Sequence, residues 1–207
     1  MPRVRVHQHV NPLAPYYRQA PEPVDVGAVF ANPKLPLHLD IGSARGRFLL
    51  RMAEAEAGWN YLGVEIREPL VDEANRIAAE SRSGNLHYSF CNAMLWLHRL
   101  LMDLPKGILQ MATIHFPDPW FKKKHAKRRM VNAELVETVV SKLAAGGRIF
   151  VQTDIEFLAQ EITGLFLQAT EVTSIQVIDN PFAVKTEREK AVEDKGLPIY
   201  RAMFKKS

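Results

Sequence analysis

The chain has 207 residues, of which 47% are hydrophobic, and a formal net charge of +4, which suits one globular domain with a sizeable core. No apolar run approaches the roughly 18 residues that a membrane-spanning helix needs. The N-terminus has no apolar signal core, so we expect a cytoplasmic protein with no membrane partner. The single cysteine, Cys91, excludes an internal disulfide, and no His/Cys cluster has the spacing of a metal site.

The positive charge is concentrated in one segment. Residues 122–129, KKKHAKRR, contain six Lys and Arg residues and no acid, and without them the remaining chain is slightly acidic. Such local basicity favours docking of a polyanion. A solvated charge run that only aids solubility explains the pattern equally well when it is considered alone.

Residues 1–36 predict a basic, proline-rich N-terminal arm outside the core. Seven prolines in this range argue against a helix or a central strand. Arg3, Arg5, His7 and His9 alternate with other residues, so an extended arm presents them on one face. That face is either a contact for a phosphate backbone or part of a frayed tail, and these residues alone favour the tail.

From residue 37 the pattern alternates between strands and helices. Strands are predicted over 37–41, 60–66, 86–91, 108–116, 148–153, 172–178 and 198–204, and helices over 47–57, 68–82, 93–102, 132–144 and 155–169. This alternation predicts an α/β domain over residues 37–207 with a doubly wound, mainly parallel sheet. The last two strands have no amphipathic helix between them, so we expect an antiparallel pair at one edge.

Polar residues follow the first three strands. Gly42 and Gly46 bracket a tight turn into a helix, which lets a ligand approach the backbone. Glu65 closes the second strand, where an acid accepts both hydroxyls of a ribose. Asn92 follows the third strand, where an amide can read an adenine edge. Ligands of such sheets bind at the carboxyl ends of the strands, so these residues predict a nucleoside cofactor site.

The glycine spacing separates two classes of cofactor. Dinucleotide-binding folds use G-x-G-x-x-G, whereas this turn has the sequence G-S-A-R-G. Asp40, just before the turn, would repel phosphates but suits a cationic sulfonium that carries an amino group. We therefore favour S-adenosylmethionine, and a dinucleotide-dependent oxidoreductase is the weaker alternative.

With these residues placed, the chain resembles the bacterial tRNA (guanine-N7)-methyltransferase family, in particular its cyanobacterial and plant-type members. The resemblance covers residues 37–204 and rests on LDIGSARGRFL, YLGVEI, FCNA, HFPDPWFKKKHAKRR, QTD and TEREK. The fourth of these motifs is the most specific. The resemblance implies a class I methyltransferase fold with a seven-stranded, Rossmann-like sheet, S-adenosylmethionine as methyl donor, and a variable-loop guanosine of tRNA as acceptor.

The resemblance also implies roles by motif position. Cofactor contacts fall to Asp40, Gly42, Gly46, Glu65, Asn92 and Asp118, substrate contacts to Lys122, Asp154, Thr186 and Glu189, and RNA contacts to Lys124, His125, Lys127, Arg128 and Arg129. Three residues depart from the family pattern. Asp40 stands where Glu is common, Asn92 where Asp is frequent, and Ala44 where glycine is usual, so Ala44 is expected to have a negative φ.

Asp118 is the predicted catalytic residue. Pro117 and Pro119 each favour an extended conformation in the residue before them, which orients the carboxylate. We expect Asp118 to accept hydrogen bonds from N1–H and N2–H₂ of guanine and to stabilise the charge that develops as N7 is methylated. The alternative role is to shape the cofactor pocket.

Two other functions remain open. A methyltransferase of an exocyclic amine often has N/D-P-P-Y/F at this position, which DPWF matches in part. A non-catalytic RNA-binding protein on the same fold would not need the pair of Asp40 and Glu65. The sequence indicates neither the oligomeric state nor an obligatory protein partner.

Overall fold

The computed structural model describes residues 10–82 and 84–207, so Arg3, Arg5, His7 and His9 of the predicted arm lie outside the described residues. The strands are β1 (Leu37–Ile41), β2 (Asn60–Glu65), β3 (Leu86–Phe90), β4 (Leu109–His115), β5 (Leu143–Thr153), β6 (Val172–Ile175) and β7 (Tyr200–Lys206). The α-helices are α1 (Val26–Val29), α2 (Arg47–Ala55), α3 (Glu68–Glu80), α4 (Ala93–Leu100), α5 (Ala133–Lys142), α6 (Glu156–Leu167) and α7 (Glu187–Glu193), and the 3₁₀ helices are η1 (Pro15–Arg18) and η2 (Lys123–Arg128).

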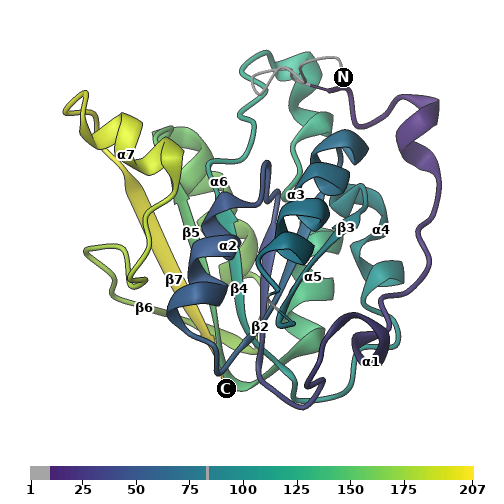
Figure 1. Cartoon of the computed structure of the whole chain (residues 1–207). Coiled ribbons are helices and arrows are strands. Elements are labelled where there is room, and N and C mark those ends of the chain that lie inside the picture. The colour runs from purple at the N-terminus through teal and green to yellow at the C-terminus, as the bar shows by residue number, and fades with distance from the viewer. Residues whose placement is uncertain (1–9, 83) are drawn as a thin grey trace.

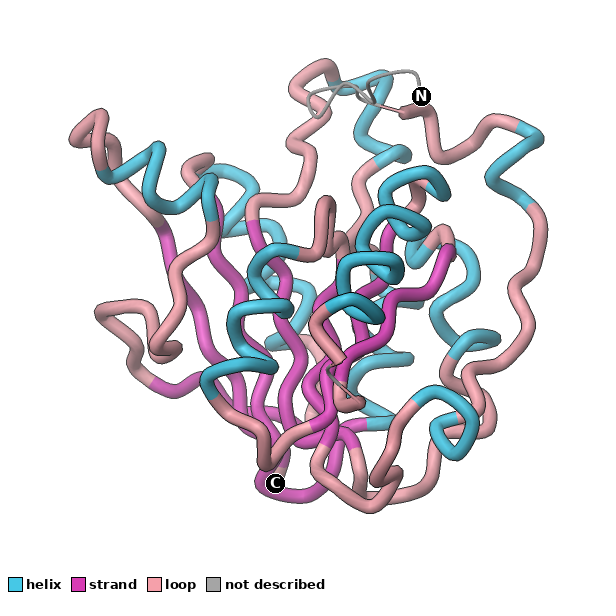
Figure 2. Tube along the Cα trace, in the orientation of Figure 1, coloured by secondary structure: helices cyan, strands magenta, loops and turns pink. Residues whose placement is uncertain are grey.

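The strands form one sheet in the order β3-β2-β1-β4-β5-β7-β6. Strands β1 to β5 pair in parallel, and β7 runs antiparallel to both β5 and β6. This confirms the predicted mainly parallel sheet with an antiparallel edge, and Figure 2 shows its magenta strands between cyan helices. The strand order reverses between β1 and β4, which is where an α/β sheet forms its ligand crevice.

Helices cover both faces of the sheet. Leu49 of α2 and Val71 of α3 belong to one core cluster, whereas Leu135 of α5 and Phe166 of α6 belong to the larger one. Figure 1 shows α2 and α3 in front of the sheet and α5 and α6 behind it. Because both faces are covered, β1 is buried along its whole length, as expected of a central parallel strand.

Residues 10–36 pack against this domain. Val24, Val26 and Phe30 belong to the larger core cluster, and the Val24 amide donates to the Leu100 carbonyl over 2.9 Å. Figure 1 shows this purple segment running along the side of the molecule. The prediction that 1–36 lies outside the core is therefore wrong for these residues, because prolines limit regular structure but do not prevent apolar side chains from packing.

Among the described residues, the short helices η1, α1, η2 and α7 form where no helix was predicted, and β5 begins earlier than expected. The predicted helix over 132–144 ends at Lys142, and Leu143 already pairs with Leu109 of β4. Gly146 has a φ of 76° and lies inside β5, near a shift of register against β4.

Within the described residues, every helix is too short or too polar to span a membrane.

Candidate active site

A cleft of about 530 Å³ opens at the carboxyl ends of β1, β2, β3 and β4. Its volume lies in the range of small-molecule sites. Of the predicted site residues, those that line the cleft are Gly42, Glu65, Asn92, Asp118, Arg128 and Asp154. The predicted residues that do not line it are Asp40, Gly46, Lys122, Lys124, His125, Lys127, Arg129, Thr186 and Glu189.

The turn between β1 and α2 forms the floor of the cleft. Gly42 and Gly46 have φ values of 88° and 70°, and the Gly42 amide donates to the Val64 carbonyl over 2.8 Å. A Cβ on Gly46 would lie 2.5 Å from the ring of Tyr88, so this glycine serves packing. Ala44 has a φ of 50°, so the expectation of a negative φ is wrong. Its amide donates to Glu65 over 2.8 Å, which holds the turn in this conformation.

Glu65 ends β2 with its carboxylate held from two sides. Besides the Ala44 amide, it accepts bonds from the Arg67 backbone amide over 3.0 Å and from Arg67 Nε over 2.8 Å. Arg67 lines the cleft beside Glu65, although no role was predicted for it. The glutamate is thus fixed in orientation at the position where an acid meets a ribose in this fold.

Asp40 lies in the interior next to the cleft. The residue is 3% exposed, and its carboxylate accepts a hydrogen bond from Thr113 Oγ1 over 2.8 Å. Burial raises its pKa to about 7, the Thr113 bond opposes that shift, and the nearby charge of Glu65 adds to it. Asp40 therefore lies beside the cleft without lining it, and His115 Nε2 is 3.9 Å from its Oδ1.

His115 stands between Asp40 and the cleft, and sequence reasoning assigned it no site role. Gln152 Nε2 donates to His115 Nδ1 over 3.0 Å, and burial lowers the pKa of the imidazole to about 3. The neutral ring therefore carries its proton on Nε2. This buried atom has no hydrogen-bond partner among the described residues, and it lies 3.9 Å from Asp40 Oδ1. Nε2 therefore lies against the buried Asp40 carboxylate and has almost no surface open to the cleft.

Asp118 is exposed at the rim of the cleft, on the segment that follows β4. Phe116 has a φ of 48°, so the prediction that it is extended before Pro117 is wrong. The Phe116 amide donates to the Gln152 carbonyl over 2.7 Å, which prolongs the β4–β5 pairing into the turn. Trp120 also has a positive φ, of 43°. Left-handed conformations at bulky residues cost free energy and concentrate at functional sites.

The basic helix η2 both supports this segment and faces solvent. Arg129, directly after it, donates from Nε to the Pro119 carbonyl over 2.9 Å and pairs with Glu161. The Arg128 guanidinium lies 5.1 Å from the centroid of the Trp120 ring. Lys122, Lys124 and Lys127 are exposed. Phe121 is also 68% exposed, against Phe157.

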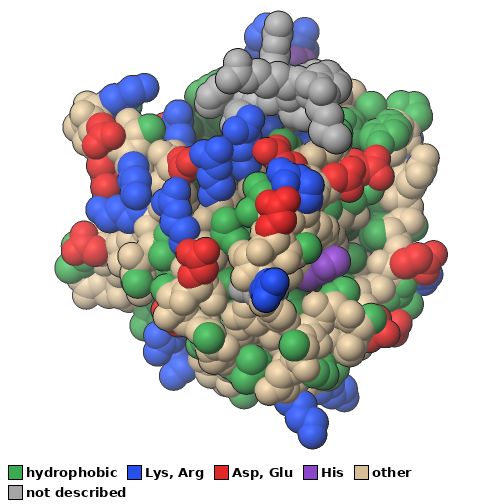
Figure 3. Space-filling model, in the orientation of Figure 1, with side chains coloured by type: hydrophobic (Ala, Val, Ile, Leu, Met, Phe, Trp, Pro, Cys, Tyr) green, Lys and Arg blue, Asp and Glu red, His purple; other side chains and the backbone are tan. Residues whose placement is uncertain are grey.

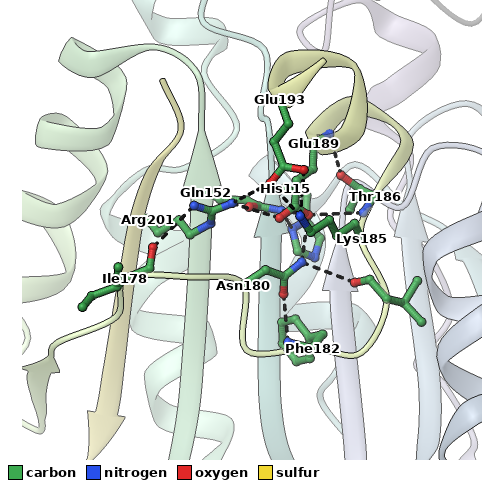
Figure 4. Close-up of polar contacts among 11 residues, drawn as sticks. His115, Gln152, Ile178, Asn180, Phe182, Lys185, Thr186, Glu189, Glu193 and Arg201 are labelled. Carbon is green, nitrogen blue, oxygen red and sulfur yellow. Dashed lines mark hydrogen bonds and ion pairs between the residues drawn. The ribbon is translucent and has the colours of Figure 1, made fainter. Parts of the chain in front are cut away.

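Thr186 and Glu189 form a buried anchor for α7 (Figure 4). Thr186 Oγ1 accepts from the Glu189 amide, and the Glu189 carboxylate accepts from the Thr186 amide, which is a capping box. Glu189 is fully buried and also accepts from Gln152 over 3.1 Å, Asn180 over 2.8 Å and Arg201 over 3.0 Å. Gln152 links this anchor to His115 and so to the cleft.

The anchor presents Arg188 of α7 to the cleft, where it pairs with Asp154 at the start of α6. Arg188 was not predicted, although it lies between the two residues of the T-x-x-E motif. Figure 3 shows basic and acidic side chains interspersed on the face near α7, in keeping with ion pairs such as Arg47–Glu187 and Lys185–Glu193.

This combination of fold and cleft defines a class I methyltransferase. A solved S-adenosylmethionine-dependent methyltransferase from Aquifex aeolicus has the same fold, with a TM-score of 0.56 and 11% identity over 83% of this chain and 82% of that one. A family model described as "Putative methyltransferase" matches residues 34–202.

Two curated relatives identify the family more closely. The tRNA (guanine-N(7)-)-methyltransferase of Trichormus variabilis is 50% identical over 100% of this chain and 98% of its own length. The enzyme of the same name from Synechococcus elongatus is 52% identical over 99% of this chain and 97% of its own length. The chain belongs to the tRNA (guanine-N7)-methyltransferase family.

Proposed function

We propose that this protein transfers a methyl group from S-adenosylmethionine to N7 of a variable-loop guanosine in tRNA. The observation that carries the proposal is a nucleoside-sized cleft that ends at Glu65 and has the exposed carboxylate of Asp118 at its rim, beside a basic helix. The family relatives, named for this reaction, support it at 50% and 52% identity.

The residues of the cleft fit the methyl donor. Glu65 would accept the ribose hydroxyls, Asn92 would face the adenine amino group, and the backbone at Gly42 would lie against the bound molecule. The donor supplies an activated methyl group on a sulfonium. In its ionised form, Asp40 would favour the cationic end of the donor through its charge.

Alignment and charge stabilisation are the contributions expected of the protein. Guanine N7 has an exposed lone pair and no proton, so the transfer needs no general base. Asp118 would accept hydrogen bonds from N1–H and N2–H₂, which adenine does not offer at the matching edge. Its charge also compensates the positive charge that develops on the purine.

The basic helix would hold the tRNA. We assign phosphate contacts to Lys124, His125 and Lys127, and a contact nearer the target nucleotide to Lys122. Arg128 would meet RNA at the rim, and Arg129 would act mainly by holding the segment that carries Asp118.

The predicted substrate residues divide into two kinds. Asp154, with Arg188, would contact the substrate at the mouth of the cleft. Thr186 and Glu189 would act from the interior by fixing α7. We assign the chemistry to residues 37–207, an accessory role to 1–36, and the cytoplasm as location, which suits the buried free thiol of Cys91.

The test is to incubate the protein with methyl-labelled S-adenosylmethionine and an unmodified tRNA transcript, and to identify the labelled nucleoside by mass spectrometry. We expect 7-methylguanosine. Label on an exocyclic nitrogen would support the alternative methyltransferase, and a protein that transfers no label would be the RNA-binding alternative. In the same assay Asp118→Asn should lower turnover about 100-fold, as loss of a charge-stabilising group does. The exposed Asp103→Asn, on the turn after α4, is the control.

A further inference from the structure

Residues 10–18 close one side of the cleft. Val10 and Pro12 line it together with the residues at the strand ends, and Pro12 is buried. The segment is folded, because the Ala14 amide donates to the Asn11 carbonyl and the Tyr17 amide to the Ala14 carbonyl, each over 3.0 Å. It therefore has a defined shape that can serve as a wall.

Asn92 connects this segment to the strand ends. The residue is 4% exposed, and its Nδ2 donates to the Pro12 carbonyl over 2.8 Å and to the Tyr17 carbonyl over 3.1 Å. Asn92 is the N-cap of α4, where an asparagine usually bonds a helix amide, yet its side chain makes no capping bond. Both bonds use Nδ2, and neither uses Oδ1.

Tyr16 provides a second attachment on the same side. Its hydroxyl donates to Glu68 at the start of α3, and its ring lies 6.2 Å from that of Phe90, at the end of β3. The segment is thus fixed to β3, α3 and the β3–α4 junction, the elements that surround the position expected for the nucleobase.

We propose that residues 10–18 form the outer wall of the nucleoside pocket and that Asn92 is the positioning residue that latches it. The two ends of the amide then have separate tasks, since Nδ2 holds the wall and Oδ1 is directed to the base amino group. The identity of the nucleoside as S-adenosylmethionine rests on the proposed function. The latch explains why an amide serves here, because an aspartate has no N–H to donate and would repel both carbonyls.

The variant Asn92→Asp separates the two tasks, because it keeps an acceptor for the base and removes both donors to the wall. Asn85→Asp is the matched control. Asn85 Nδ2 also donates to two carbonyls, of Trp59 and Ala53, but at the opposite end of the sheet. Tyr16→Phe is a second, milder variant that removes only the bond to Glu68.

The measurements are hydrogen exchange of the amides of residues 11–18 and the Kd of S-adenosylhomocysteine by calorimetry. We expect Asn92→Asp to speed exchange in the segment and to raise the Kd about tenfold, the effect of losing two net hydrogen bonds. Tyr16→Phe should also speed exchange and raise the Kd, but by less. Asn85→Asp should lower Tm and leave the exchange of the segment and the Kd unchanged. In the unaltered protein, S-adenosylhomocysteine should slow exchange of the segment.

Normal exchange of the segment in Asn92→Asp, or an unchanged Kd despite faster exchange, would overturn the proposal. Failure of the proposed function gives a different result. If the unaltered protein bound S-adenosylhomocysteine but methylated no tRNA, the proposed function would fail and the wall would stand.

Discussion

Ala44 holds a φ of 50° in the turn at the floor of the cleft. A left-handed conformation costs an L-residue about 1–2 kcal/mol, whereas glycine adopts it freely. Glycine also gives the unfolded chain more conformational entropy, which offsets about 0.4–1 kcal/mol of the stability gained by relieving this strain. We predict that Ala44→Gly raises the free energy of unfolding by about 0.5–1 kcal/mol, measured by urea denaturation.

The exposed Ala79 in α3 is the control for this change. At a helical position glycine costs up to about 1 kcal/mol, so Ala79→Gly should lower stability. If both substitutions destabilised the protein alike, the strain at Ala44 would be contradicted.

The buried carboxyl group of Asp40 predicts a pH dependence. Burial raises its pKa to about 7, so the folded protein binds this proton more tightly than the unfolded chain, whose Asp pKa is about 3.9. The protonated carboxyl group therefore contributes its full stabilisation below about pH 4. As pH rises from there to about 7, this contribution is lost at up to about 1.4 kcal/mol per pH unit, and it does not return at higher pH.

Asp40→Asn removes the pH dependence that comes from this carboxyl group. The buried His38 and His115 are present in both proteins, so their own contributions cancel in the comparison. The free energy of unfolding of the unaltered protein, relative to the variant, should fall between pH 5 and 7 and then level off. A constant difference across urea titrations at pH 5, 6, 7 and 8 would rule out the raised pKa.

At the level of elements, α7 depends on its capping box. Thr186→Ala removes the side-chain acceptor at the start of the helix, which typically costs about 1 kcal/mol. For a chain of this length we expect Tm to fall by about 2–4 °C. The KM for tRNA should stay within twofold well below Tm. The exposed Thr173→Ala in β6 is the control, and a raised KM with an unchanged Tm would instead place Thr186 in contact with substrate.

The basic helix η2 predicts a salt-dependent interaction. Lys124 is exposed and adjoins the segment of Asp118, so Lys124→Gln should reduce the slope of log K for tRNA against log salt by about 1. Lys34→Gln removes the same charge from an exposed position before β1, at the far end of the sheet, and should leave the slope unchanged. Equal effects of the two variants would contradict docking at η2.

The sequence could predict the strands and the longer helices but not the short helices. Strands such as β1 and β4 are apolar runs, and α5 and α6 carry apolar stripes, so hydrophobic pattern alone located them. The helix α7 has the sequence EREKAVE and η2 is almost wholly cationic, so neither has an apolar period. Both depend on tertiary contacts, of Glu189 with Arg201 and of Arg129 with Pro119.

At the scale of the whole molecule, the site residues that follow strands were predictable, since topology alone brings Glu65, Asn92 and Asp118 to one cleft. Residues that reach the cleft only through tertiary packing were not predictable from the sequence. Pro12 lies 80 positions from the amide that holds it, and Arg188 is presented by a helix that the pattern did not indicate. Asp40 is a residue for which the sequence predicted a contact that the structure does not show. Its position before the glycine turn suggested contact with the cofactor, whereas β1 directs its side chain towards Thr113.

The proposed function makes N7 of a guanine in tRNA the acceptor atom. The most direct test uses two tRNA transcripts that differ only at the variable-loop guanosine, which is replaced in one by 7-deazaguanosine. This analogue keeps the N1–H and N2–H₂ edge for Asp118 but has a C–H in place of the N7 lone pair. We predict that the labelled methyl group is transferred to the guanosine transcript and not to the analogue, which should still bind and inhibit. Equal transfer to both transcripts would rule out N7 as the acceptor atom.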